Sequence, residues 1–195
     1  GYDSALRACE GSLERMGLDY VDLILIHWPL PRIDRYVDSW RAFVELRDRG
    51  LARSIGVSNF TSEHIERLVG ETGVAPAVNQ IELHPYFPQG TQRAYDQTHD
   101  ILTQSWSPLG RKTGLLDAAV LAEIAEHHGV STAQVVLRWH VELGAVPIPK
   151  SADPGRMATN LDVFGFDMSS EEVDEIGTLD TGERIGGDPD VHEEF

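Results

Sequence analysis

Residues 23–29 read LILIHWP, four apolar residues that run directly into a histidine, a tryptophan and a proline. A short, continuous apolar run of this kind is typical of a strand buried on both faces in a parallel sheet. A histidine at the end of such a strand needs a reason, because the carboxyl ends of parallel strands are where α/β barrels carry their active sites. His27 is therefore the first candidate for a functional residue.

Apolar, β-branched runs alternate with helical patterns along the whole chain. Strands are expected at residues 21–26, 54–57, 77–82, 101–106 and 145–148. Helices are expected at residues 3–16, 38–49, 62–71, 90–98, 118–128, 132–142, 154–161 and 170–178. Strands that alternate with helices predict a parallel α/β sheet.

Local signals mark the ends of several of these helices. Ser131 with Gln134, and Ser169 with Glu172, match the capping box that satisfies the first N–H groups of a helix. Four glycines follow helical runs, where a left-handed residue often ends a helix: Gly17, Gly50, Gly73 and Gly129.

The sheet could be an open doubly wound sheet or a (β/α)8 TIM barrel. No Gly-x-Gly-x-x-Gly follows any expected strand, which counts against the usual dinucleotide-binding open sheet. A barrel needs eight βα units and about 250 residues, whereas five are found in these 195 residues. We therefore expect a single domain, residues 1–195, that supplies about five C-terminal βα units of a barrel. The first three units would be missing or supplied by a partner.

Composition narrows the class of protein. The formal charge of −16 argues against a nucleic acid or an anionic membrane as partner. No apolar run approaches the roughly 20 residues of a membrane helix, and the first residues lack the layout of a secretory signal. The single cysteine, Cys9, falls in a helical pattern and is expected in the core, which suits a cytoplasmic location.

Five segments, in order along the chain, resemble the aldo-keto reductases, and among these the bacterial 2,5-diketo-D-gluconate reductases. They are GLDYVDLILIHWP (17–29), RSIGVSNF (53–60), AVNQIELHP (77–85), SWSPLG (105–110) and IPKSADPGRMATNLDVFGF (148–166). The resemblance implies a (β/α)8 barrel. It also implies NADPH-dependent reduction of small carbonyl substrates, aldehydes or ketones, with keto-sugar acids among the candidates.

The resemblance gives roles to the residues that end the first three strands. His27 would be the catalytic residue that orients the substrate carbonyl through a ring N–H, and Trp28 would line the substrate pocket. Ser58, Asn59 and Gln80 would bind the nicotinamide carboxamide with short, fixed donors and acceptors. Capping of strand ends is the structural alternative for these three residue types.

The fourth strand would end in further cofactor-binding residues. Trp106 would stack on the nicotinamide ring. Ser107, Leu109 and Gly110 would form a loop close to the cofactor pyrophosphate, with a plain turn as the alternative.

Lys150 and Arg156 flank a loop that leads into a helix, and two cations stand out in a chain of charge −16. With the hydroxyl of Ser151 and the helix N-terminus they would form an anion site. The resemblance assigns this site to the adenosine 2′-phosphate, which would select NADPH over NADH. Asn160 would contact the adenine.

Some expected features are absent or altered. Close relatives often carry a carboxylate at Thr159 and a basic residue near Asp153. The tyrosine acid of the family, with its lysine and aspartate, would lie before residue 1. None of the five tyrosines falls at a matching strand end, so the isolated chain is expected to be inactive.

No metal site is expected. His127 and His128 would point in different directions on their helix, and no His-Glu-x-x-His occurs. His84 reads as a structural strand end, and Glu172 as part of a solvated helix face. Two other functions stay open: a non-enzymatic interaction subunit with the aldo-keto reductase fold, and a different phosphate-binding barrel enzyme. A complete barrel is expected to be monomeric.

Overall fold

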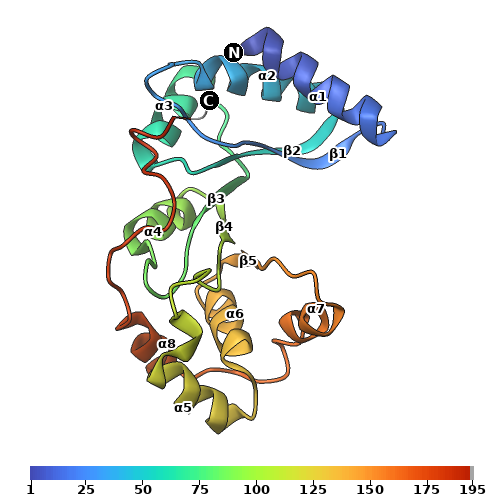
Figure 1. The fold of residues 1–195 in the computed structure, drawn as a ribbon. Coiled ribbons are helices and arrows are strands. Elements are labelled where there is room, and N and C mark those ends of the chain that lie inside the picture. The colour runs from blue at the N-terminus through green and yellow to red at the C-terminus, as the bar shows by residue number, and fades with distance from the viewer. Residues whose placement is uncertain (194–195) are drawn as a thin grey trace. The chain divides into compact units, whose positions relative to one another are not determined.

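The computed structural model of the protein describes residues 1–193. Its five strands are β1 (Val21–Ile26), β2 (Ala52–Ser58), β3 (Val78–Glu82), β4 (Leu102–Trp106) and β5 (Val146–Ile148). They form one sheet in the order β1-β2-β3-β4-β5 (Figure 1). The pairs β1–β2, β2–β3 and β4–β5 are parallel, as the alternation of strands and helices predicts.

The helices also follow the expected pattern. They are α1 (Tyr2–Met16), α2 (Tyr36–Asp48), α3 (Ser62–Thr72), α4 (Gly90–Thr98), α5 (Ala119–His128), α6 (Thr132–Glu142), α7 (Pro154–Leu161) and α8 (Ser170–Gly177). A short 3-10 helix, Leu115–Asp117, was not expected. Within residues 1–193, no helix combines the length and apolar character needed to cross a membrane.

The chain divides into two compact units. Unit 1 comprises Gly1–Gln80, Thr91–Leu102 and the described residues from Gly187 onward. Unit 2 comprises Ile81–Gly90 and Thr103–Gly186. The expectation of a single domain over residues 1–195 remains a prediction, and residues 194 and 195 lie outside the described part of the chain.

The core of unit 1 lies where α2 and α3 pack onto β1 and β2. Trp40, Leu46, Val57 and Ile65 are fully buried in it, and burial of each such side chain contributes about 1.5–3 kcal/mol. Cys9 is 4% exposed and belongs to this core, which confirms its predicted place.

β1 differs from the prediction. It was expected to be buried on both faces, but five of its six residues are only half-buried and Asp22 is exposed. The physical reason is that β1 is the first strand in the sheet order and pairs only with β2. An edge strand has a neighbour on one side only and keeps more of its surface exposed.

The core of unit 2 gathers residues of α5, α6 and α8, among them Leu121, Val135 and Ile176. Both predicted capping boxes are present, at Ser131 before α6 and at Ser169 before α8. The predicted glycines Gly17, Gly50, Gly73 and Gly129 have positive φ angles of 67°, 75°, 70° and 66°. A third capping box, Thr61 with His64, was missed because histidine is not the residue the motif normally carries at that place.

Candidate functional site

The polar residues after β1, β2 and β3 form one hydrogen-bonded cluster in unit 1. Ser58, the last residue of β2, pairs in register with Gln80, which lies in the middle of β3 and not at its predicted end. The backbone N–H of Asn59 donates to the Gln80 carbonyl at 2.9 Å, and its side-chain amide donates to the His27 carbonyl at 3.0 Å. Asn59, the residue after β2, is therefore hydrogen-bonded to β3 and to the residue that follows β1.

Ser58 completes the cluster. Its hydroxyl donates to the Gln80 carbonyl at 2.8 Å and accepts from the Asn59 side-chain amide at 3.1 Å. Ser58 and Asn59 are 3% and 5% exposed. These hydrogen bonds are the structural capping that is the alternative to a cofactor-binding role. The cofactor-binding role of Ser58, Asn59 and Gln80 remains a prediction.

Trp28 packs against a C-terminal segment for which the sequence predicts no regular structure. His27 is exposed, and its ring centroid lies 6.1 Å from that of Trp28. Trp28 stacks on His192, with ring centroids 3.9 Å apart. A Cβ on Gly187 would overlap the His192 ring, so only glycine fits at position 187. The Gly186–Gly187 pair was therefore the one sequence signal of close packing in this segment.

In unit 2, Trp106 at the end of β4 is packed from two sides. The Arg111 guanidinium lies 5.3 Å from the Trp106 ring centroid. A Cβ on Gly186 would lie 2.4 Å from the Trp106 ring, so only glycine permits this close approach.

Glu82 binds the backbone of the segment that contains Ile185 and Gly186. Its carboxylate accepts the N–H groups of Ile185 at 2.5 Å and Gly186 at 2.8 Å, and Nε2 of His84 lies 3.0 Å from it. Burial would raise the pKa of Glu82, but these hydrogen bonds outweigh it and keep the pKa below its ordinary value. His84 is fully buried beside Glu82, in agreement with the structural role predicted for it.

The loop after β4 is a tight turn. Ser107 has a φ of 51° and Gly110 a φ of 68°, and the Gly110 N–H donates to the Ser107 carbonyl at 2.9 Å. The Ser107 hydroxyl accepts from Nε of Arg111 at 2.7 Å. The turn that was the structural alternative is thus present, and the pyrophosphate role of Ser107, Leu109 and Gly110 stays a prediction.

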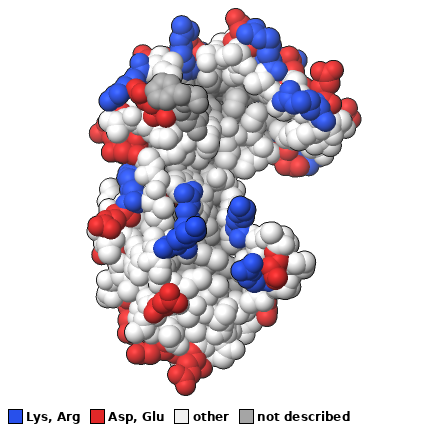
Figure 2. All heavy atoms as spheres, viewed as in Figure 1, with Lys and Arg blue, Asp and Glu red and all other residues white. Residues whose placement is uncertain are grey.

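Five of the predicted cofactor-binding residues line one cavity of about 460 Å³ in unit 2, which we call the basic cavity. Its lining residues are Leu109, Leu116, Ser131, Ala133, Lys150, Ser151, Ala152, Arg156, Thr159 and Asn160. No acidic side chain belongs to this lining. In the lower part of Figure 2, Lys and Arg side chains gather on the face in view, whereas Asp and Glu are most frequent at its lower end.

The helix N-terminus contributes less to this cavity than expected. Asp153 caps α7, and its side chain accepts the Arg156 backbone N–H at 2.8 Å. Oγ of Ser151 accepts the Asp153 N–H at 3.1 Å. The capping carboxylate therefore binds an amide that an anion would otherwise use, and the predicted anion site would depend on the side chains of Lys150 and Arg156.

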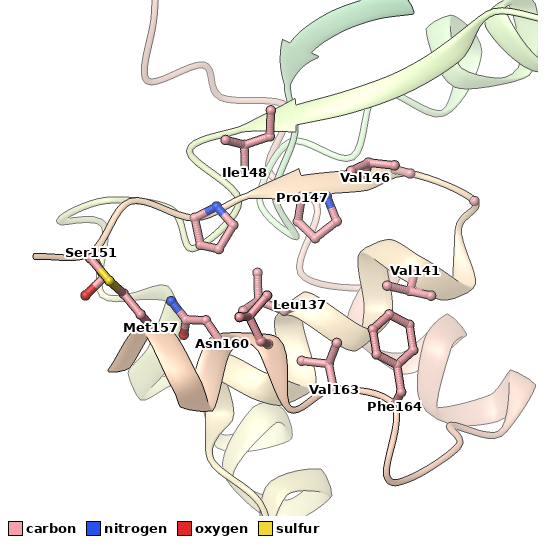
Figure 3. A pocket seen from close by; sticks show the side chains of 14 residues that line it. Leu137, Val141, Val146, Pro147, Ile148, Ser151, Met157, Asn160, Val163 and Phe164 are labelled. Atoms are coloured by element: carbon pink, nitrogen blue, oxygen red, sulfur yellow. The ribbon is translucent and has the colours of Figure 1, made fainter. Parts of the chain in front are cut away.

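A second cavity of unit 2 is apolar and measures about 870 Å³. Figure 3 shows Leu137 of α6, Pro147 of β5 and Val163 around the same space. Leu161 and Phe164, which also line it, are 77% and 73% exposed.

The prediction that His127 and His128 point in different directions is wrong. Nδ1 of His127 and Nε2 of His128 lie 3.0 Å and 2.8 Å from the same oxygen, Oε1 of Glu172. Glu172 is likewise not a solvated residue, since its side chain is only 14% exposed. The histidines are adjacent in the chain and project from the last turn of α5, where side chains can converge on one partner.

The chain was compared with known protein families and with characterised proteins. The model of the aldo/keto reductase family matches residues 2–181. The chain is 55% identical to 2,5-diketo-D-gluconic acid reductase B of a Corynebacterium species, over 100% of this chain and 70% of that protein. It is 49% identical to methylglyoxal reductase DkgA of Escherichia coli K12, over 92% of this chain and 66% of that protein.

Solved structures agree with these relatives. The crystal structure of Gox0644 without ligand is 48% identical and has a TM-score of 0.96, covering 100% of this chain and 72% of that one. A mutant of the same protein, solved in complex with NADPH, has a TM-score of 0.95. The predicted fold class is confirmed, because the parallel α/β sheet of this chain matches (β/α)8-barrel structures of these reductases. The chain belongs to the aldo/keto reductase family.

Proposed function

We propose that this chain carries the cofactor-binding part of an NADPH-dependent reductase that converts aldehydes or ketones to alcohols. The observation that carries the proposal is the basic cavity. It brings together Lys150, Ser151, Arg156 and Asn160, the residues that the sequence assigns to the adenosine end of NADPH. Two cations, a hydroxyl and an amide are a donor set that fits a phosphate and an adenine.

The resemblance implies a separate role for each predicted cofactor-binding residue. Lys150 and Arg156 would bind the 2′-phosphate, and Trp106 would offer a flat face to the nicotinamide. Asn59 and Gln80 would bind the carboxamide. NADPH, when bound, supplies the hydride.

His27 would act on the substrate rather than on the cofactor. Its ring is exposed at the end of β1, and an imidazole N–H there can donate a hydrogen bond to a carbonyl oxygen and fix its orientation. Trp28, stacked on His192, would form an adjoining apolar wall. His192 thereby joins the residues proposed to shape the substrate site.

Reduction also needs an acid that protonates the carbonyl oxygen. The resemblance assigns this acid to a tyrosine paired with a lysine and an aspartate, and none of the five tyrosines of this chain matches it. Leu161 and Phe164 expose apolar surface at the apolar cavity, which a further polypeptide segment would cover. An intact mass matching a longer polypeptide in the native sample would support this arrangement, and a stable monomer of 195 residues that reduces carbonyls would contradict it.

The substrate class follows from the relatives. One acts on 2,5-diketo-D-gluconic acid and another on methylglyoxal, according to their names. We propose small carbonyl substrates, with keto-sugar acids first among them. A cytoplasmic location and a monomeric complete barrel belong to the same proposal.

Cofactor titration tests the central part of the proposal. NADPH added to the chain is expected to quench tryptophan fluorescence in a saturable way, and ribose 5-phosphate is expected to leave it unchanged. Trp106→Phe should remove most of the quenching while NADPH affinity, measured by calorimetry, changes little. Quenching by the sugar phosphate and not by NADPH would instead favour a different phosphate-binding barrel enzyme.

A further inference from the structure

Three potential metal ligands converge at one place in unit 2, in a cluster that the proposed function does not use. His127 and His128 come from the last turn of α5, and Glu172 comes from the first turn of α8. The imidazole nitrogens and the carboxylate oxygen all lie within 4.8 Å of one another. Both nitrogens face the same oxygen, at 3.0 Å and 2.8 Å.

The orientation of the Glu172 carboxylate is fixed by hydrogen bonds with Ser169. Its Oε2 accepts the Ser169 backbone N–H at 2.8 Å, while its own N–H donates to Oγ of Ser169 at 3.2 Å. The capping box therefore fixes the carboxylate and leaves Oε1 directed at the two imidazoles.

The two histidines of the cluster differ in how far they are exposed to solvent. The His128 side chain is 15% exposed and its ring lies 5.1 Å from that of Phe166, which restricts its movement. The His127 side chain is 72% exposed, so an ion can reach the cluster from solvent without displacing the core.

We propose that His127, His128 and Glu172 form a binding site for a divalent transition-metal ion, with Zn²⁺ as the first choice. Two imidazoles and a carboxylate are a ligand set that Zn²⁺ accepts, with water in the fourth position. Metal–ligand bonds of about 2.0–2.2 Å in a tetrahedron place ligand atoms about 3.3 Å apart. The two nitrogen–oxygen distances would need to lengthen by about 0.3–0.5 Å from their hydrogen-bonded values. The two imidazole nitrogens already lie within 4.8 Å of each other, so rotation of the exposed His127 side chain can complete the geometry.

The place of the cluster in the fold suggests a structural rather than a catalytic role. The two histidines lie at the C-terminal end of α5, where the helix dipole favours a cation. A bound ion would join the end of α5 to the beginning of α8. Because the ion would bind the folded chain and not the unfolded one, it would raise the melting temperature as its concentration rises.

Isothermal titration of the tag-free, metal-stripped chain tests this site. Zn²⁺ is expected to bind saturably at one ion per chain, and Mg²⁺, which prefers oxygen ligands, is expected not to bind. His127→Gln removes an exposed ligand and should weaken Zn²⁺ affinity about tenfold or more. Glu172→Gln should do the same, although glutamine can still complete the capping box.

The matched control is His99→Gln, which removes an exposed histidine of unit 1 that hydrogen-bonds to the Tyr95 carbonyl. It should leave Zn²⁺ affinity unchanged. Far-UV circular dichroism verifies that each variant folds, and His127→Gln, the most exposed change, keeps the test valid if Glu172→Gln does not fold. Equal Zn²⁺ affinity in wild type and both cluster variants, or no saturable binding at all, would show a hydrogen-bonded His–Glu cluster without a metal role.

Discussion

The side-chain amide of Asn59 donates a hydrogen bond of 3.0 Å to the main-chain carbonyl of His27. The residue after β2 thereby fixes the backbone of the residue after β1. Asn59 does this with a φ of 61°, a left-handed conformation that asparagine tolerates better than most residues. The position of the proposed catalytic histidine therefore depends on a side chain and on a backbone conformation at one neighbouring residue.

Asn59→Ala is expected to lower the free energy of unfolding by about 2–4 kcal/mol. About 1–3 kcal/mol comes from the two hydrogen bonds that the Asn59 amide donates to His27 and Ser58, at about 0.5–1.5 kcal/mol each. About 1 kcal/mol comes from an alanine held in the left-handed region. Asn59→Gly loses the same hydrogen bonds but accepts the conformation. The free energy of unfolding in urea should be highest for wild type, lower for Asn59→Gly and lowest for Asn59→Ala. An alanine variant as stable as the glycine variant would refute the cost assigned to the left-handed backbone conformation.

Gly186→Ala is expected to detach the segment that packs on Trp106. An added Cβ would lie 2.4 Å from the Trp106 ring and 2.9 Å from Oε2 of Glu82, closer than real contacts allow. Trp106 should become more exposed, with a red-shifted emission and faster proteolysis after residue 180. Gly177→Ala is the control, because a Cβ there meets nothing within 4 Å. Identical emission spectra for the two variants would contradict this packing.

The lowered pKa of Glu172, about 2, predicts that the free energy of unfolding falls in acid as this carboxylate takes up a proton. In the unfolded chain a glutamate has a pKa of about 4.3, so the unfolded state takes up the proton first. The stabilisation is complete above about pH 5 and is lost as the pH falls toward 2. With EDTA present, unfolding free energy should fall more steeply between pH 5 and pH 3 for wild type than for Glu172→Gln, and parallel curves would count against the shift.

Much of the fold could be predicted because its signals are local. The bounds of α6 and α7 agree with the sequence to the residue, since the Ser131 hydroxyl caps the start of α6 and a Pro occupies the first position of α7. The alternation of strands and helices then decides the class of sheet. These signals act within a few residues and do not depend on the rest of the chain.

The candidate site could be predicted only in part, because its details depend on contacts between distant residues. The sequence placed Lys150, Ser151 and Arg156 together, and these neighbours do line one cavity. It could not place Glu172 beside His128, because 44 positions separate them. It also missed the stacking of His192 on Trp28, since an irregular segment has no periodicity to interpret.

Selection of NADPH over NADH by Arg156 is the most direct test of the proposed function. A charge-assisted hydrogen bond to the 2′-phosphate is worth about 1.5–3 kcal/mol, which corresponds to about 10–100-fold in affinity. Calorimetric titration of Arg156→Gln should show that loss for NADPH and an unchanged affinity for NADH. Lys112→Gln, an exposed lysine outside the lining of the basic cavity, should bind both cofactors as wild type does. Equal losses for the two cofactors in Arg156→Gln, or no NADPH binding by the wild-type chain, would contradict the proposal.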